Sequence, residues 1–222
     1  MRILTWNLAG RWSDRHQEAL VSADCKVWLL TEVSDRLTLP GYRGHVTTAD
    51  MRPKVRWAGV FSRLDVEPLP DPHPASAMAR VDGMTFVSSI LLWKGTGTVE
   101  PWHGTNHAER THQTLETLLR AMPTSELCWG GDWNHAFSGP DYAGGRAGRT
   151  ALAEAVADLG LSVPTAQLPH ALGGLLSLDH IAVPSSWNVL SAERIPGTDV
   201  TGRLSDHDLY VVDAPVGSPT PR

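Results

Sequence analysis

Three short apolar runs in this chain are each followed closely by a polar side chain that can bind a cation. The runs cover residues 3–6, 27–30 and 127–129, and the polar residues after them are Asn7, Glu32 and Asp132. Short runs rich in Val, Ile, Leu and Trp are typical of buried strands. Strand ends in a layered fold meet at one edge, so we expect these side chains to share an acidic pocket.

The apolar pattern as a whole predicts a mixed α/β domain. Strands are expected at 2–6, 26–31, 55–62, within 77–92, and at 126–130, 177–183, 187–193 and 207–213, with helices at 13–23, within 105–121 and at 149–159. The first helix joins two strands that must then be parallel. Asp82-Gly83 predicts a hairpin inside 77–92. These signals favour a largely antiparallel arrangement, with two packed sheets and helices outside.

Length and composition indicate one folded domain. The 222 residues contain no linker, so we expect a single domain over 1–213 and a flexible tail over 214–222.

A net charge of −5 argues against a strong basic footprint for long duplex nucleic acid, although a bound metal could still attract a nucleic-acid substrate. No signal peptide or membrane-spanning run is present, so the expected compartment is cytoplasmic. Cys25 and Cys128 are expected to be reduced core thiols.

The carboxylates Glu32 and Asp206 each lie beside residues that should be buried. A buried ionised carboxylate is costly unless it is paired or bound to metal. Hard oxygen ligands suit Mg²⁺ or Mn²⁺, which complete their shell with water and substrate phosphate. Asn7 adds an amide that could orient a carboxylate or contact a phosphate oxygen. For Glu32 alone, an ordinary ion pair or helix cap is an equally good explanation.

Two further motifs carry polar groups suited to hydrolysis. Asp132 and Asn134 flank Trp133, and in an extended strand both would face one side and could hold a water molecule; an Asx turn is the alternative. His207 could stabilise charge on a phosphate if Asp179 orients its ring. Taken singly, an Asp-His pair is more often a solvated turn.

The order of these motifs resembles that of the endonuclease/exonuclease/phosphatase superfamily, whose members include deoxyribonuclease-I-like nucleases. The motifs that carry the resemblance are, in chain order, Asn7, Glu32, Gly131-Asp132-Trp133-Asn134, Asp179-His180 and Ser205-Asp206-His207. The resemblance implies an α/β fold, a four-layered α/β sandwich of two mostly antiparallel sheets flanked by helices. It also implies a metal-dependent phosphoester hydrolase.

The resemblance implies a role for each matching residue. Glu32 would be the principal metal ligand, with Asn7 and Asp206 beside it, for Mg²⁺ or Mn²⁺. Asp132 would activate or orient the attacking water. The remaining roles are phosphate contact for Asn134, transition-state stabilisation for His207 and orientation of that ring for Asp179.

Two departures from the family pattern leave the substrate open. The stretch Ser88-Ser89-Ile90-Leu91 lacks the His or Tyr that many members carry there, and His103 or His107 could substitute. The chain is also short for the family.

A nuclease acting on DNA or RNA is our leading interpretation, supported by Arg52, Lys54 and Arg56 near Trp57, which could bind a single strand. A phosphatase or phosphodiesterase for a small molecule and a non-catalytic binding module are the alternatives; oligomeric state is not predicted.

Overall fold

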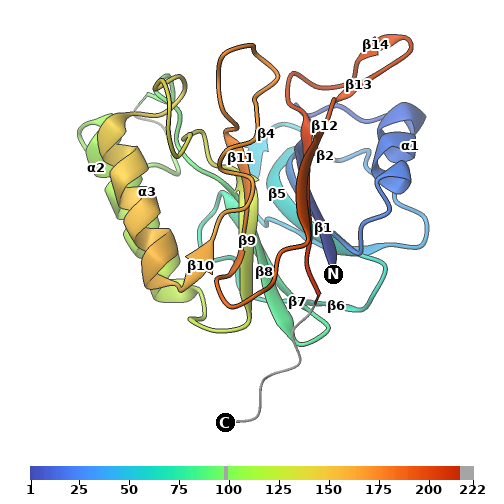
Figure 1. The fold of residues 1–222 in the computed structure, drawn as a ribbon, viewed down its shortest axis with the longest axis horizontal. Helices are drawn as coiled ribbons and strands as arrows, with labels where there is room; N and C mark the ends of the chain where they lie inside the picture. Colours follow the sequence, from blue (N-terminus) through green and yellow to red (C-terminus); the bar gives the residue numbers. More distant parts are fainter. Residues whose placement is uncertain (98–99, 216–222) are drawn as a thin grey trace.

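The computed structural model describes residues 1–97 and 100–215 and is built in four layers (Figure 1). Two sheets pack against each other in the middle of the molecule. Helix α1 (Asp14–Ser22) covers the outer face of one sheet, while α2 (His107–Ala121) and α3 (Arg146–Asp158) cover the outer face of the other. The predicted α/β sandwich of two sheets flanked by helices is confirmed.

Sheet A, the sheet beside α1, contains seven strands. Their order is β12 (Ser191–Ile195), β15 (Leu209–Asp213), β1 (Arg2–Asn7), β2 (Val27–Ser34), β5 (Val55–Ser62) and β3 (Arg43–Val46), with β4 (Asp50–Arg52) also paired to β5. Within this sheet β1 and β2 are parallel and the other pairs are antiparallel. The parallel pair is the one that α1 connects, as the sequence predicts.

Sheet B, beside α2 and α3, contains six strands. Their order is β10 (Leu161–Ser162), β11 (Asp179–Pro184), β9 (Leu127–Asp132), β8 (Met84–Ile90), β7 (Ser76–Val81) and β6 (Val66–Pro68). Here α2 connects the parallel pair β8 and β9. The predicted hairpin joins β7 to β8, and Asp82 and Gly83 have φ angles of 51° and 78°, which suit its tight turn. Strands β13 (Thr198–Asp199) and β14 (Gly202–Arg203) pair outside both sheets.

Apolar side chains fill the space between the layers. Leu29 from sheet A and Phe86 and Ile181 from sheet B belong to the cluster between the two sheets, and all three are fully buried. Gly130 lets the sheets approach closely, because a Cβ at this position would lie 2.7 Å from Leu29 Cδ1. Burial of this apolar surface is the main force that holds the two sheets together.

The structure corrects several predicted boundaries. Strand β2, expected to end at residue 31, continues to Ser34, although Glu32 interrupts its pairing with a φ of 48°. Helix α3 begins at Arg146 rather than at residue 149. Six short strands are not predicted from the sequence, because each has four residues or fewer and so carries little periodic signal: β3, β4, β6, β10, β13 and β14.

The two ends of the described chain lie together, because β1 and β15 are neighbouring inner strands of sheet A. Ala214 is buried, and its amide donates a hydrogen bond to the carbonyl of Met1. Residues 216–222 of the predicted tail lie outside the described residues. Cys25 and Cys128 are buried free thiols, as expected. None of the helices in the described part of the chain has the length and apolarity needed to cross a membrane.

Candidate active site

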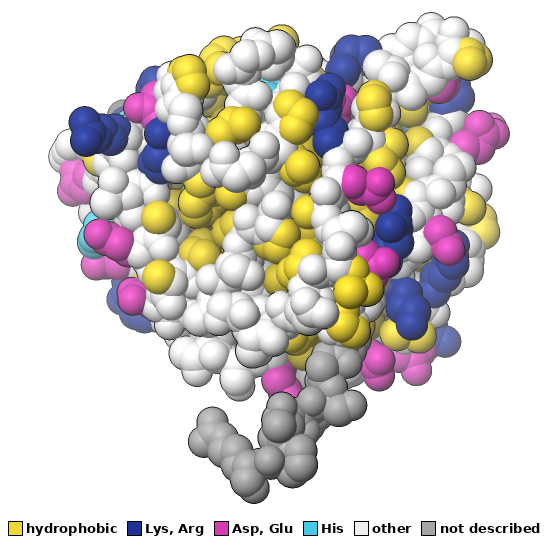
Figure 2. Space-filling model, in the orientation of Figure 1, with side chains coloured by type: hydrophobic (Ala, Val, Ile, Leu, Met, Phe, Trp, Pro, Cys, Tyr) yellow, Lys and Arg dark blue, Asp and Glu magenta, His cyan; other side chains and the backbone are white. Residues whose placement is uncertain are grey.

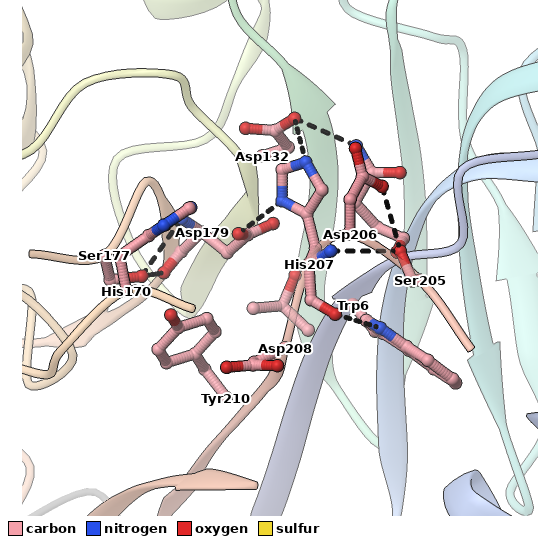
Figure 3. A network of polar contacts seen from close by, with 12 residues as sticks. Trp6, Asp132, His170, Ser177, Asp179, Ser205, Asp206, His207, Asp208 and Tyr210 are labelled. Carbon is pink, nitrogen blue, oxygen red and sulfur yellow. Dashed lines mark hydrogen bonds and ion pairs between the residues drawn. The ribbon is translucent and has the colours of Figure 1, made fainter. Parts of the chain in front are cut away.

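The predicted site residues come from both sheets and meet at one edge of the sandwich. In sheet A, Asn7 ends β1 and Glu32 lies near the end of β2. In sheet B, Asp132 ends β9 and Asp179 begins the antiparallel strand β11, directly opposite in the register. The loop before β15 brings Ser205, Asp206 and His207 to the same edge (Figure 3).

Asn7 links carboxylates from the two sheets. Its Nδ2 donates to Asp132 Oδ2 at 2.9 Å and to Glu32 Oε1 at 3.2 Å. Its Oδ1 accepts the backbone N–H of Ala9 at 2.8 Å, which fixes the orientation of the amide. The Asn7 side chain is therefore a shared hydrogen-bond donor; its predicted role as a metal ligand stays a prediction.

His207 lies between Asp179 and Asp132 (Figure 3). Its Nδ1 donates to Asp179 Oδ2 at 2.8 Å, and its Nε2 lies 3.9 Å from Asp132 Oδ2. Burial alone lowers the pKa of His207, but the carboxylates of Asp179 and Asp132 outweigh burial and raise this pKa to about 10. His207 is therefore an imidazolium at neutral pH, held in one orientation by the fully buried Asp179.

Asp132 is buried, with 4% of its surface exposed. Burial raises its pKa; the charge of His207 and the hydrogen bond from Asn7 counteract part of this effect, while Asp179 adds to it. The net result is a pKa above the ordinary range of an aspartate. A carboxylate of this kind is suited to accept a proton near neutral pH.

Asn134 lies beside Asp132, but not in the way the sequence analysis expects. Strand β9 ends at Asp132, and Asn134 has a φ of 55°, so the extended geometry with both side chains on one face is wrong. Instead, the Asn134 N–H donates to Asp132 Oδ1 at 3.2 Å, and its Nδ2 donates to Leu91 O at 3.0 Å. This is the Asx turn that the sequence analysis names as the alternative.

The loop that carries Asp206 is fastened to β1. Ser205 Oγ donates to the carbonyl of Asn7 at 2.7 Å and accepts the His207 N–H at 3.2 Å. Asp206 itself is exposed at the rim of the site. The loop therefore holds His207 in place and leaves the Asp206 carboxylate open to solvent.

The donor set at this edge fits a hard divalent cation. Glu32, Asp132 and Asp206 offer carboxylate oxygens and Asn7 an amide, which are ligands that Mg²⁺ and Mn²⁺ prefer. Glu32 already attracts a cation, because Arg52 Nη1 donates to its Oε2 at 2.8 Å. With 20% of its side chain exposed, Glu32 is also accessible from solvent.

His170 is a neighbour of the site that the sequence analysis misses (Figure 3). One nitrogen of His170, one oxygen of Asp179 and one nitrogen of His207 lie within 4.8 Å of one another, close enough to suggest a metal group. However, His170 Nδ1 accepts the Leu172 N–H at 3.0 Å, and burial lowers its pKa. The neutral ring thus carries its proton on Nε2, which leaves neither ring nitrogen free to bind a metal in this arrangement.

His103 and His107, suggested as substitutes for the His or Tyr missing from the stretch 88–91, have other contacts. His107 packs against His135, with ring centroids 5.7 Å apart, and His103 pairs with Glu100 at 3.6 Å. Within residues 1–97 and 100–215, neither donates a hydrogen bond to a predicted site residue. In the sequence, His170 lies outside every predicted strand and motif. The tripeptide Pro-His-Ala at 169–171 is the one local signal that could have indicated a site residue there.

Comparison with known proteins shows the fold. No protein-family model matches the chain, and no curated protein matches its sequence. Among solved structures, the AP endonuclease LMAP from Leishmania major gives a TM-score of 0.67 at 15% identity, over 95% of this chain and 86% of that one. An endonuclease/exonuclease/phosphatase family protein from Leptotrichia buccalis gives 0.61 at 15% identity, over 96% and 99% of the two chains.

The chain has the endonuclease/exonuclease/phosphatase fold. Sphingomyelinase C from Streptomyces griseocarneus shares this fold too, with a TM-score of 0.54 at 14% identity over 96% of this chain and 98% of that one. An AP endonuclease and a sphingomyelinase act on different substrates, so the fold alone leaves the substrate open. The substrate must be argued from the residues around the site.

Proposed function

We propose that this chain is a divalent-metal-dependent phosphoester hydrolase, and specifically a nuclease that cleaves phosphodiester bonds by in-line attack of water. The observation that carries the proposal is the contact chain Asn7–Asp132–His207–Asp179, which crosses from one sheet to the other. It gathers a proton acceptor, an imidazolium and an amide at one point, and these are the groups that phosphoester hydrolysis requires.

Glu32, with Asn7 and Asp206, would hold Mg²⁺ or Mn²⁺. A bound divalent ion supplies polarisation of a phosphoryl oxygen and compensates the charge that develops there. Arg52 balances Glu32 in the structure, so an ion would compete with this side chain for the carboxylate.

Asp132 would take the proton of the attacking water. Its raised pKa makes it a better proton acceptor than an exposed aspartate, and Asn7 Nδ2 fixes the position of Oδ2. The backbone N–H of Asn134 holds the other oxygen, Oδ1. Both oxygens are thus oriented before substrate binds, which lowers the cost of reaching the reactive geometry.

His207 would stabilise the negative charge that develops on the phosphate. Its Nδ1 is committed to Asp179, so the second N–H, on Nε2, is left to face a phosphoryl oxygen. A charged donor that is already oriented in a buried site stabilises a transition state strongly. The amide of Asn134 would contact the same phosphate.

The test is to incubate the chain with Mg²⁺ or Mn²⁺ and offer plasmid, single-stranded DNA, RNA and a panel of phosphomonoesters, with Asp132→Asn as the control. Cleavage of a nucleic acid by the wild type and not by the variant supports a nuclease. Hydrolysis of phosphomonoesters alone would mean a small-molecule phosphatase. If the chain hydrolyses none of these substrates with Mg²⁺ or Mn²⁺, the proposal is refuted and a binding module is favoured.

A further inference from the structure

A cavity of about 410 Å³ lies beside Glu32, and most of its charged side chains are positive. Three cations line it, Arg11, Arg36 and Lys54, together with one acid, Asp35, and the partly buried ring of Trp12. Its size falls in the range of pockets that hold small ligands. None of the predicted catalytic or metal-binding residues lines this cavity.

The cavity shares a wall with the candidate active site. Gly10, which lines the cavity, donates its N–H to the carbonyl of Glu32 at 3.0 Å. Arg52 lies over the same glycine, since a Cβ on Gly10 would be 2.5 Å from Arg52 Nη2. A ligand that fills the cavity would therefore lie next to anything bound at Glu32.

The three cations of this cavity have no acidic partner among the described residues. The Arg11 side chain donates to the carbonyl of Leu204, at 3.3 Å, and Arg36 and Lys54 are exposed. By contrast, the cavity beside α2 is lined by Arg120 with two acids, Glu100 and Glu116. Like charges around one cavity repel one another, and a bound anion would relieve the repulsion.

This cluster differs from the basic patch suggested by the sequence. Arg52 pairs with Glu32, and Arg56 pairs with Asp50 at 3.2 Å, so neither is free. Trp57 is only 6% exposed and offers no stacking face. Of that patch, Lys54 alone remains available to bind an anion. It lines the cavity with Trp12, Arg11 and Arg36 instead.

We propose that this cavity is a nucleotide subsite, which binds one nucleotide of a single-stranded nucleic acid next to the scissile phosphate. Trp12 stacks on the base, and Arg11, Arg36 and Lys54 contact the backbone phosphates, the combination by which proteins bind single strands. The inference rests on the proposed function for the position of the scissile phosphate. The face of the molecule in Figure 2 intersperses acidic and basic side chains and shows no continuous basic stripe along which a long duplex could lie.

Binding of a fluorescein-labelled oligothymidylate of about eight nucleotides tests the subsite. Anisotropy is measured in EDTA, so that the strand is not cleaved. Arg36→Glu/Lys54→Glu should weaken binding at least about tenfold and reduce its salt dependence, because phosphate contacts are lost. Trp12→Ala should weaken binding by about fivefold or more through lost stacking. A control for added negative charge is Lys26→Glu, which lies just before the opposite end of β2.

Each outcome decides the matter. Loss in the cavity variants with wild-type affinity in Lys26→Glu supports the subsite. Equal weakening in all charge variants, or full binding by a folded Trp12→Ala, would overturn it. Competition by thymidine 5′-monophosphate but not by inorganic phosphate supports a nucleotide site, and equal competition by both overturns it in favour of a general anion site.

The subsite and the proposed function can fail separately. If the wild type binds the oligonucleotide through the cavity but hydrolyses no substrate with Mg²⁺ or Mn²⁺, the proposed function is wrong and the subsite stands. If the Arg36→Glu/Lys54→Glu variant cleaves single-stranded DNA with the KM of the wild type, the subsite is wrong and the function stands.

Discussion

His73 provides a sharp test of how burial tunes charge in this fold. The side chain is 7% exposed and stacks on Trp102, with ring centroids 5.1 Å apart. Its Nδ1 accepts the Ala75 N–H at 3.1 Å. Burial lowers the pKa of His73 from 6.5 to about 4, because the charged ring would lose its hydration.

This pKa shift makes the free energy of unfolding depend on pH. Between the two pKa values the unfolded chain binds a proton at His73 that the folded chain does not. The contribution is therefore fully present above pH 6.5 and is lost as the pH falls towards about 4. With these two pKa values, linkage gives a loss of about 2 kcal/mol at pH 5, relative to neutral pH.

Comparison with His73→Asn isolates this one group. Asparagine keeps an acceptor for the Ala75 N–H but does not titrate. We expect the variant to be less stable than the wild type at about pH 7.5, because stacking on Trp102 is lost. At pH 5 the stability gap should shrink by about 2 kcal/mol, since the other titrating groups are common to both chains and cancel. Urea unfolding followed by tryptophan fluorescence measures both gaps.

The control is Leu115→Ala, a change on the buried face of α2 that removes no titrating group. Its stability gap with the wild type should be the same at both pH values, although the variant is destabilised by about 2–5 kcal/mol. A gap for His73→Asn that also stays constant between pH 7.5 and pH 5 would refute the reasoning from burial.

Three further predictions concern the site. Asp179→Asn should lower kcat about 10²- to 10⁴-fold without unfolding the chain, because His207 loses the carboxylate that orients it; steady-state kinetics and circular dichroism check this. His170→Ala should lower kcat about tenfold because it removes the N–H beside Asp179 and His207, and His170→Gln, which keeps an N–H, should restore part of it; equal kcat in the two variants would contradict this reasoning. Gly130→Ala should lower both stability and kcat, whereas Gly173→Ala, where an added Cβ meets nothing within 4 Å, should change neither in melting and activity assays.

The strand-end pattern in the sequence carries most of the information about the site. Asn7, Glu32, Asp132 and Asp179 each lie at or near the end of an apolar run, and the topology of two packed sheets brings these ends to one edge. The pattern predicts the site because the local sequence determines where each strand ends, and the connections between strands determine which ends meet at one edge. The short edge strands lack such a pattern and cannot be predicted in the same way.

The missing details depend on contacts between segments far apart in the chain. The turn at Asn134 is stabilised by the carbonyl of Leu91, 43 residues earlier. Arg52 reaches Glu32 from another strand, and His170 reaches the site from a loop without regular structure. No local pattern encodes such contacts, so residues of this kind can be found only once the chain is folded.

One charge imbalance explains three separate features of the site. Four carboxylates gather at this edge, and His207 and Arg52 are the cations that pair with them in the part of the chain that the structure describes. Negative charge in excess raises the pKa of His207, contributes to the raised pKa of Asp132 and draws Arg52 onto Glu32. A divalent ion at Glu32 would remove the same excess, so its binding should oppose the proton on Asp132. Metal affinity should therefore rise with pH, and it should rise less steeply in Asp132→Asn, which isothermal titration at two pH values can measure.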